Sequence, residues 1–384
     1  MTHLFPNYSR REVEFVSGEG CTRVDAQGQQ YLDLTSGIGV VGLGYNHPEL
    51  NQALQEQSTA IWHTPNLYQN SLQETLAQQL GGSFEYLSYF CNSGAEANEA
   101  AIKLARKATG RTKVISFTHS FHGRTYGAMS ATGQAAIHEG FQPLVPGFSY
   151  VAYNDLEGLK AELDQGTAGV MLELVQGEGG VLPAQKEWAK GVAELCKKNG
   201  TLLIVDEVQT GIGRTGTFYA FEGYGLDPDI VTLAKGLGNG FPVGAMLGKK
   251  EIASAFGPGS HGSTFGGNKL GLSVATKVVA AINQPHFLGA VVHKGNQAMK
   301  YLTSALQGNP LVKDIRGKGL MIGIELADGD AAGKALDRLQ AQGVLVLRAG
   351  TSVLRLLPPL TITEAELAEG IQKISHVLEE MKND

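Results

Sequence analysis

The segment LSYFCNSGAEANEAAIKLARKATGRTKVISF, residues 87–117, is typical of a strand, a helix and a second strand. Ala, Glu and Lys dominate residues 94–109, and Gly110 follows them, as expected for a helix and its C-terminal cap. A strand is expected to end near Cys91, and the apolar run VISF at 114–117 predicts the next strand. This alternation is the repeating unit of a parallel sheet.

The same alternation continues along the chain. Further apolar runs of the buried-strand type lie at 170–174, 202–205 and 230–234. The other predicted helices span residues 155–164, 185–199, 269–283 and 363–382. The pattern predicts an α/β fold with a mostly parallel sheet that carries helices on both faces.

The alternation changes near residue 284, where Asn283-Gln284-Pro285 interrupts a helical stretch. Beyond it we expect a long helix, short strands and a final helix, which together form a smaller α+β domain. The predicted short strands cover residues 312–317, 320–326, 344–347 and 353–356. We therefore predict three parts, namely an N-terminal segment over 1–44 that joins the small domain, a large domain over 45–283 and the small domain over 284–384.

The first part contains CTRVDAQGQQYLDL, residues 21–34, which predicts a β-hairpin with its turn at Asp25–Gly28.

Composition excludes several classes of protein. The chain has 384 residues, of which 42% are hydrophobic and 18% charged, and its formal net charge is −6. These values fit a globular protein of two or three domains and argue against nucleic acid or an anionic membrane as the main partner. Glycine is abundant, with 51 residues, as expected where many tight turns are needed.

Targeting and metal signals are weak. The first residues have no apolar signal-peptide core, and no apolar run approaches the roughly 18 residues of a membrane span. The cysteines Cys21, Cys91 and Cys196 are isolated and show no metal-ligand spacing, and the histidines show none either. We therefore expect a cytoplasmic protein without a structural metal.

Three features stand at the carboxyl ends of predicted strands, where open α/β sheets bind ligands. The first is the turn Asn92-Ser93-Gly94-Ala95, whose small residues at a helix N-terminus favour an anion. The second is Asp206 and the third is Lys235, each at the end of an apolar run. A buried carboxylate needs a partner, and a desolvated lysine can act as an amine nucleophile.

Each feature alone has an ordinary structural explanation. Ser93 could simply cap the helix, Asp206 could cap a turn, and an isolated lysine usually extends to the surface. Together, however, an anion-binding turn, a carboxylate and an amine match the phosphate, the ring nitrogen and the aldehyde of pyridoxal phosphate (PLP).

The chain resembles the class III aminotransferases of the PLP fold type I group almost from end to end. Six motifs carry the resemblance: NSGAEANEAAIK (92–103), SFHGRT (120–125), VQGEGG (175–180), DEVQTGIGRTG (206–216), AKGLGNGFPVGA (234–245) and HGSTFGGN (261–268). Each motif is short, but their occurrence together in this order is specific. The resemblance implies a large PLP-binding domain, a smaller α+β domain and a ping-pong transamination.

The resemblance also implies roles for individual residues. Lys235 forms the aldimine with the cofactor and then moves the proton during transamination, while Asp206 keeps the ring nitrogen protonated. Cofactor contacts are further expected from Ser93, Gly94, Ala95, Phe121, Glu207, Val208, Gln209 and Thr264. Thr264 contacts the phosphate held by the neighbouring subunit, which implies a homodimer with shared active sites. His122 is interpreted as a hydrogen-bonded structural histidine.

Substrate carboxylates are expected to bind two arginines. Arg124 is the candidate for the carboxylate far from the reacting carbon, and Arg355 for the near carboxylate of 2-oxoglutarate. Glu178 corresponds to the acid that pairs with Arg355 during the amine half-reaction and releases it for the oxoacid. Ser263 is expected to touch the donor, and Tyr8 to line the entrance.

Within the family, the chain is most similar to members that use N2-acetyl-L-ornithine and 2-oxoglutarate in arginine biosynthesis. Relatives that use free ornithine carry Tyr where this chain has Ile38, and an aliphatic residue leaves room for an acylated donor. Leu174 departs from the proline that is common in the family, so we expect a local backbone difference there.

Three alternatives remain open at this stage. The donor could be succinyl-diaminopimelate, succinylornithine, ornithine or 4-aminobutyrate. An aminomutase would need no external oxoacid, which the predicted arginine sites argue against. A non-catalytic binding protein of the same fold is the third, although Lys235 stands in full motif context.

Overall fold

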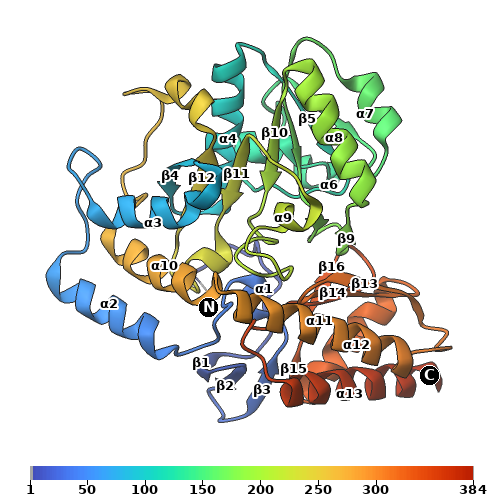
Figure 1. Ribbon diagram of the computed structural model, residues 1–384. Coiled ribbons are helices and arrows are strands. Elements are labelled where there is room, and N and C mark those ends of the chain that lie inside the picture. Colours follow the sequence, from blue (N-terminus) through green and yellow to red (C-terminus); the bar gives the residue numbers. More distant parts are fainter. Residues whose placement is uncertain (1–2, 384) are drawn as a thin grey trace.

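The computed structural model describes residues 3–383 and contains one seven-stranded sheet and two four-stranded sheets (Figure 1). The large sheet has the order β4 (Leu87–Cys91), β12 (Gly244–Gly248), β11 (Ile230–Leu233), β10 (Leu202–Asp206), β7 (Thr167–Leu172), β5 (Lys113–Phe117) and β6 (Phe148–Val151). Its strands are parallel except β12, which runs antiparallel to β11 and β4. The predicted mostly parallel sheet is confirmed, but the sequence analysis missed β12.

Helices cover the large sheet and fill the space beside it. They are α2 (Pro48–Ala60), α3 (Ser71–Gly81), α4 (Gly94–Thr109), α5 (Tyr126–Ala131), α6 (Ala135–His138), α7 (Leu156–Glu162), α8 (Lys186–Asn199), α9 (Ala220–Tyr224) and α10 (Lys269–Ile282). Short 3-10 turns are η1 (Gly82–Phe84), η2 (Lys235–Leu237), η3 (Lys250–Phe256) and η4 (Met381–Asn383). The four helices predicted in this part of the chain are confirmed, each end within two residues.

Both faces of the large sheet are buried, as the near-continuous apolar runs require. Leu203 and Val205 of β10 belong to the same apolar cluster as Trp188 of α8. Ile204, between them, points to the opposite face and joins the cluster that contains Ile102 of α4. Successive strand residues thus serve opposite layers, which places α8 and α4 on opposite sides of the sheet (Figure 1).

The remaining elements form two four-stranded sheets, one two-stranded sheet and four helices. One sheet has the order β1 (Phe15–Glu19), β2 (Thr22–Asp25), β3 (Gln30–Asp33) and β15 (Val344–Leu345). The other has the order β13 (Val312–Lys318), β14 (Met321–Leu326), β17 (Val353–Leu356) and β16 (Leu347–Ala349), and β8 (Val175–Gln176) pairs with β9 (Leu182–Pro183). Their helices are α1 (Ser36–Gly39), α11 (Pro285–Ala305), α12 (Gly329–Ala341) and α13 (Glu364–Glu380).

The N-terminal hairpin shares a sheet with the C-terminal part of the chain. The predicted hairpin is confirmed, because β2 and β3 pair antiparallel and the Gly28 N–H donates to the Asp25 carbonyl (3.0 Å). β3 also pairs in parallel with β15. The division of the chain at residues 44 and 283 stays a prediction.

Two predicted strands differ in the structure. The stretch 344–347 was expected to be one strand, but Val346 separates β15 from β16, which belong to different sheets. The chain crosses from one sheet to the other at this point. The run 170–174 was expected to stay in the sheet, but β7 ends at Leu172 and leaves Glu173 and Leu174 beyond the strand.

The carboxyl ends of β4, β5, β7, β10 and β11 lie at the same edge of the large sheet, because these strands are parallel. The segments that follow them carry most of the predicted site residues. Among residues 3–383, no helix is both long and apolar enough to cross a bilayer.

Candidate active site

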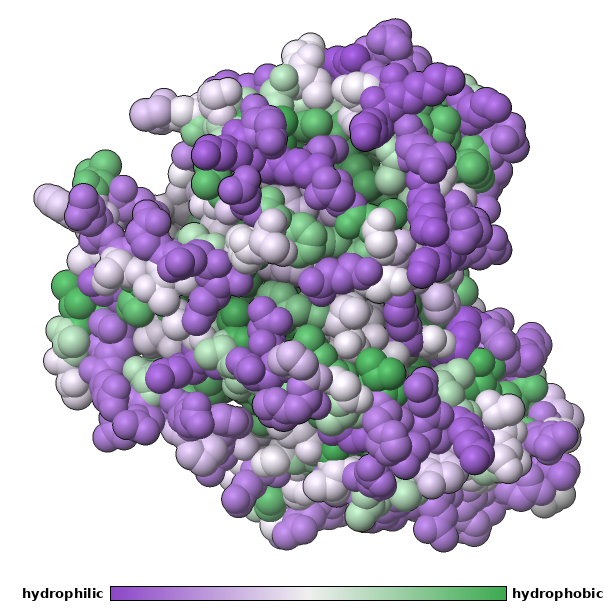
Figure 2. Space-filling view, in the orientation of Figure 1, coloured by the Kyte–Doolittle hydropathy of each residue, from purple (hydrophilic) through white to green (hydrophobic). Residues whose placement is uncertain are grey.

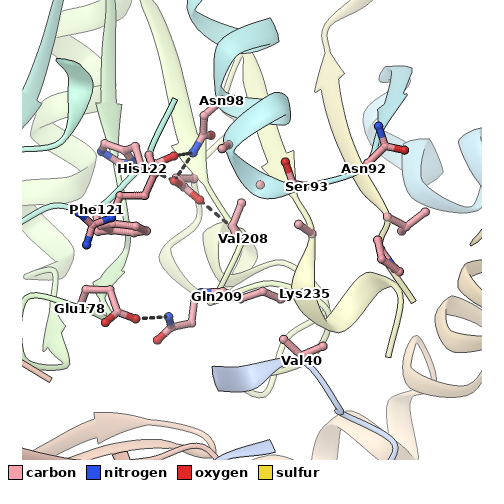
Figure 3. Close-up of a pocket in the computed structure, with 18 of the residues that line it drawn as sticks. Val40, Asn92, Ser93, Asn98, Phe121, His122, Glu178, Val208, Gln209 and Lys235 are labelled. Atoms are coloured by element: carbon pink, nitrogen blue, oxygen red, sulfur yellow. Dashed lines mark hydrogen bonds and ion pairs between the residues drawn. The ribbon is translucent and has the colours of Figure 1, made fainter. Parts of the chain in front are cut away.

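A cavity of about 400 Å³ opens at this edge of the sheet (Figure 3). Ten of the residues predicted from the sequence line it, namely Ser93, Gly94, Ala95, Phe121, Arg124, Glu178, Asp206, Val208, Gln209 and Lys235. They come from segments far apart in the sequence. Val40, which follows α1, reaches the cavity from the side opposite the large sheet.

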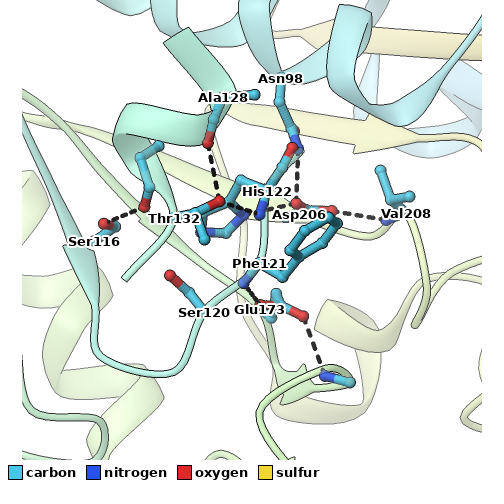
Figure 4. A network of polar contacts seen from close by, with 12 residues as sticks. Asn98, Ser116, Ser120, Phe121, His122, Ala128, Thr132, Glu173, Asp206 and Val208 are labelled. Carbon is cyan, nitrogen blue, oxygen red and sulfur yellow. Dashed lines mark hydrogen bonds and ion pairs between the residues drawn. The ribbon is translucent and has the colours of Figure 1, made fainter. Parts of the chain in front are cut away.

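Asp206 is fixed at the end of β10 by three hydrogen bonds (Figure 4). Its Oδ2 accepts from Asn98 Nδ2 of α4 (2.8 Å) and contacts His122 Nδ1 (2.7 Å), and its Oδ1 accepts from the Val208 N–H (3.0 Å). The side chain is almost fully buried, so these contacts replace the water that a free carboxylate would bind. A carboxylate held in this way has a fixed orientation and retains accepting capacity toward the cavity.

His122 lies within hydrogen-bond distance of this carboxylate. Burial disfavours the imidazolium, but the hydrogen bond to Asp206 and the charges of Asp206 and Glu173 outweigh it and raise the pKa of His122. Its backbone carbonyl accepts from Asn98 Nδ2 (2.7 Å), and its Nε2 is buried without a protein partner. The interpretation of His122 as a hydrogen-bonded histidine is confirmed.

Lys235 begins the short turn η2, one residue after the end of β11, and it adopts a positive φ of 45°. Positive φ is uncommon for non-glycine residues, and such residues tend to cluster at functional sites. Burial lowers the pKa of the Lys235 amine, and Arg355 lowers it further, while the carboxylates of Glu178, Asp206 and Glu173 act in the opposite direction. A lowered pKa leaves more of the amine unprotonated and therefore nucleophilic.

The N-terminus of α4 faces the cavity. Ser93 is its N-cap and accepts from the Glu96 N–H (3.2 Å), and the following residues Gly94 and Ala95 line the cavity. A Cβ at Gly94 would lie 2.7 Å from Cγ1 of Val208, so only glycine lets the helix end approach Val208. Free N–H groups and the helix dipole favour an anion here.

Glu178 and Arg355 form an ion pair at the other side of the cavity. Glu178 Oε1 lies 2.6 Å from Arg355 Nη1 and accepts from Gln209 Nε2 (3.3 Å). Burial opposes ionisation of Glu178, but the charge and hydrogen bond of Arg355 prevail and lower its pKa. Arg355 also donates from Nη1 to Gln209 Oε1 (3.2 Å) and is 2% exposed, whereas the side chain of Glu178 is 31% exposed.

The segment after β5 forms a third wall. Phe121 is half-buried in the cavity lining, and the guanidinium carbon of Arg124 stands 5.6 Å from the centroid of its ring. Arg124 itself is exposed at the mouth. An arginine at this place can meet an anionic group that reaches out of the cavity.

Five predicted residues lie outside the cavity lining, namely Glu207, Arg355, Ser263, Thr264 and Tyr8. Arg355 is connected to it through Glu178, and Ser263 Oγ accepts from Asn92 Nδ2 (3.3 Å) at its edge. Thr264 and Tyr8 are exposed.

The Glu207 carboxylate does not reach the cofactor side of the sheet. It is buried and accepts from the backbone N–H groups of Ala220 and Phe221 and from Thr210 Oγ1. Burial raises its pKa to about 7, and these hydrogen bonds act against that shift. Adjacent strand residues point to opposite faces, so Asp206 faces the cavity while Glu207 stabilises the start of α9.

The lining residues that were not predicted as site residues include the polar side chains of Asn98 and Glu173. Glu173 is 5% exposed, and burial raises its pKa to about 7. The available signal for Glu173 was an acid at the end of an apolar run, the same signal that identified Asp206. Asn98 lay inside a helix, where its sequence position says nothing about the distant carboxylate it contacts.

The fold and the cavity define a class of enzyme, and the comparison with known proteins agrees. The chain belongs to the class III aminotransferases, since the family described as Aminotransferase class-III matches residues 6–378.

Particular relatives cover the whole chain. The acetylornithine aminotransferase of Streptococcus mutans is 54% identical over 380 residues, which are 99% of this chain and 100% of the relative. A solved N-acetylornithine aminotransferase from Stenotrophomonas maltophilia has a TM-score of 0.85 at 36% identity, and the match covers 97% of each chain. An ornithine aminotransferase from Toxoplasma gondii, whose active site holds PLP at partial occupancy, has a TM-score of 0.95 at 32% identity over 100% of this chain and 94% of that one. The predicted family and fold class are confirmed.

Proposed function

We propose that this enzyme transfers the terminal amino group of N2-acetyl-L-ornithine to 2-oxoglutarate, with PLP as cofactor. The products are N-acetyl-L-glutamate 5-semialdehyde and L-glutamate, and the reaction is a step of arginine biosynthesis. The observation that carries the proposal is the Glu178–Arg355 ion pair beside Lys235. Arg355 can be neutralised by Glu178 when one substrate is bound and by a substrate carboxylate when the other is bound. Similarity to acetylornithine aminotransferases over the whole chain supports the choice of donor.

The residues of the cavity fit PLP. The N-terminus of α4, with the glycine that permits close approach, suits the phosphate, and the oriented carboxylate of Asp206 suits a protonated ring nitrogen. Phe121 and Val208 supply apolar surface on the lining, and Lys235 supplies the amine for the aldehyde. When bound, this cofactor acts as an electron sink that acidifies the carbon bearing the donor amine.

Proton movement then falls to Lys235. Because its pKa is lowered, more of the Lys235 amine is unprotonated and free to accept a proton, which it can then return to a neighbouring atom. Asp206 contributes by its fixed negative charge, and His122 and Asn98 keep that charge in place. None of these groups has to rearrange during the reaction, which is the property expected of an electrostatically preorganised site.

The two substrates differ in where they carry negative charge. N-acetylornithine has its carboxylate far from the reacting carbon, where Arg124 can bind it, and places no charge near Arg355. Glu178 neutralises Arg355 in that case, since an unpaired buried arginine is costly. 2-Oxoglutarate brings a second carboxylate that competes for Arg355, and the partly exposed Glu178 can turn away.

Ile38 lies in the first turn after β3, two residues before Val40 of the cavity lining. Ile38 is 44% exposed and holds a φ of 70°, in a turn whose residues Ser36 to Gly39 all have positive φ. We propose that its aliphatic side chain accommodates the acyl group, in place of a polar partner for a free amine.

We also propose a homodimer that shares its active sites. Large apolar side chains are exposed on the loop between α2 and α3 and beside Thr264, namely Ile61, Trp62, Leu67, Tyr68 and Phe265. Figure 2 shows apolar side chains at the protruding tip of this loop. Asn66 ties the loop to the second segment, since its Nδ2 donates to the carbonyls of Ser263 (3.1 Å) and Gly266 (3.0 Å). Apolar surface of this kind marks an interface.

The dimer can be tested by mixing two inactive variants. Thr264→Ala and Lys235→Ala subunits should each have little activity, and mixed dimers should regain it at the site that combines intact residues. Light scattering would give the mass of the assembly.

We place the enzyme in the cytoplasm, because its three cysteines are free and buried, as in proteins of reducing compartments.

The decisive experiment is a half-reaction followed by absorbance. Protein loaded with PLP, without oxoacid, receives N-acetylornithine, ornithine, 4-aminobutyrate or succinyl-diaminopimelate in separate cuvettes. Rapid loss of the bound-cofactor band with N-acetylornithine, restored by 2-oxoglutarate, supports the proposal. Loss with another donor alone would retain the aminotransferase and replace the donor. Absence of any cofactor band would contradict the proposed cofactor site.

A further inference from the structure

A buried carboxylate that the reaction does not use connects two walls of the cavity. Glu173 Oε1 accepts from the Phe121 N–H (2.9 Å), and Oε2 accepts from the Gly177 N–H (3.1 Å). Figure 4 shows both contacts below the Asp206 cluster. One wall carries Phe121, and the other begins the turn that contains Glu178. The carboxylate is the acceptor for both, so it fixes the spacing between them.

The turn at 177–180 is held from its other side by the C-terminal part of the chain. The Gly350 N–H donates to the Glu178 carbonyl (2.9 Å), and Arg316 Nη2 donates to the Gly180 carbonyl (2.7 Å). Gln176 Nε2, just before the turn, donates to the Thr118 carbonyl (2.9 Å). Main-chain groups on both sides of Glu178 are therefore fixed, while its carboxylate remains partly exposed.

We propose that Glu173 is a positioning residue for the charge switch, which holds the backbone before Glu178 so that the Glu178 carboxylate meets Arg355. This inference rests on the proposed function, because it assigns Glu173 to the half-reaction in which Arg355 must be neutralised. Glu173 touches neither Arg355 nor Glu178 in the hydrogen bonds and ion pairs of residues 3–383. It acts through the peptide of Gly177, the residue directly before Glu178.

The expected effect on the two half-reactions depends on which position of Glu178 is favoured by the hydrogen bond from the Gly177 N–H to Glu173. A fixed Gly177 peptide favours the paired state of Glu178 and Arg355. Loosening it spreads Glu178 over more positions and leaves Arg355 unpaired more often. The amine half-reaction should then slow, and a dicarboxylate should find Arg355 more available.

A second explanation predicts a different pattern. Glu173 adds negative charge near Asp206 and His122 and raises the pKa of His122. If that charge were its main contribution, its loss would alter the environment of the cofactor ring. Both half-reactions and the absorbance band of the bound cofactor would then change together.

The test uses Glu173→Gln in the holoenzyme, with Asp25→Asn as the matched control. A carboxamide has a single oxygen, so one of the two backbone N–H groups would face an NH2 group. Asp25 is a buried acid that likewise accepts from two backbone N–H groups, those of Gln27 and Gln29, but in the N-terminal hairpin. Both of these N–H groups donate to Asp25 Oδ1, and Oδ2 accepts from the Tyr31 hydroxyl (3.0 Å). Asp25→Asn therefore replaces a buried, hydrogen-bonded carboxylate by a carboxamide away from the cavity. Glu173→Asp, which is too short to bridge both walls, serves if the first variant does not fold.

We expect Glu173→Gln to slow the N-acetylornithine half-reaction about tenfold and the 2-oxoglutarate half-reaction less than about twofold. Calorimetry with glutarate, a dicarboxylate that cannot react, should show tighter binding by about threefold. The cofactor band should stay in place, and Asp25→Asn should leave all three measurements at the wild-type value. Equal slowing of both half-reactions, or a shifted band, would overturn the proposal.

A double-mutant cycle gives the sharpest result. If Glu173 works through Glu178, adding Glu173→Gln to Glu178→Ala should cause no further loss in the amine half-reaction. Additive losses would show an independent role and contradict the inference. Failure of the proposed function would look different, because the wild-type enzyme itself would then not respond to N-acetylornithine.

Discussion

Two walls of the cavity differ in how their charged groups are held. On the wall built by the large sheet, Asp206 has three neighbours within hydrogen-bond distance and is 3% exposed. On the opposite wall, Arg355 depends on Glu178, whose side chain is 31% exposed and whose remaining side-chain contact, to Gln209, is 3.3 Å long. One carboxylate is locked, and the other has room to move.

The difference corresponds to what each wall has to do. A group that stabilises the same charge in both half-reactions benefits from a fixed orientation, because no reorganisation is then required. A group that must serve two substrates with different charges has to change its partner. The comparison predicts that substitutions in the first wall affect both half-reactions, while substitutions in the second wall separate them.

The largest effect is expected at Lys235, which both half-reactions require. Lys235→Ala should reduce each half-reaction by on the order of 10⁴-fold, because the amine nucleophile and the proton carrier are lost together. Stopped-flow absorbance would measure both rates. Lys294→Ala is the control, since Lys294 is a half-buried lysine that donates to the carbonyls of Leu360 and Ile362 away from the cavity. Retained activity in Lys235→Ala would remove the residue from the mechanism.

The next effect tests the locked carboxylate. Asp206→Asn keeps the size of the side chain and removes its charge, and we expect both half-reactions to slow about 10³-fold. Asp229→Asn is the matched control, because Asp229 accepts from the Leu203 N–H (2.8 Å) at the opposite end of β10. A loss confined to one half-reaction would contradict the assignment of Asp206 to the wall that serves both half-reactions.

The sequence predicted the locked wall better than the movable one. Asp206 and Lys235 follow apolar runs, and a polar residue at the end of a buried strand is a local signal that periodicity reveals. The same reasoning misplaced the end of β7 by two residues and so treated Glu173 as part of a strand. Its role depends on the N–H groups of Phe121 and Gly177, which only the folded chain brings together.

Resemblance to a family supplied what local signals did not, and it had limits of its own. It named Arg355 and Glu178, which the structure pairs, although they are 177 positions apart. It also placed Glu207 with the cofactor, whereas the structure turns that carboxylate toward α9. The antiparallel strand β12 was missed because a stretch beginning and ending in glycine, GAMLG, has low strand propensity, and pairing with β11 and β4 overrides it.

A smaller effect separates the half-reactions. Glu178→Ala leaves Arg355 buried without its carboxylate, and we expect the N-acetylornithine half-reaction to slow about 30-fold, since loss of one partner of a buried pair is costly. The 2-oxoglutarate half-reaction should change little, because its own carboxylate supplies the missing charge. Glu162→Ala, which removes an ion pair with Lys113 on the surface, is the control. Equal slowing of both half-reactions would refute the switch.

The smallest effect concerns the strained turn that leads to Val40 on the movable wall. Gly39 has a φ of 74°, and a Cβ there would meet only ordinary contacts, 3.6 Å from Leu357 and 3.7 Å from Gln209. Gly39→Ala should therefore cost about 1 kcal/mol of folding stability through backbone strain alone. Gly333 is the matched position, because it lies within α12 with open space around its Cβ, and Gly333→Ala should stabilise by about 1 kcal/mol. Calorimetric unfolding should move the two midpoints in opposite directions. If Gly39→Ala left the free energy of unfolding unchanged, the backbone of the turn could adopt another conformation at little cost. The requirement for glycine at this position of the movable wall would then be refuted.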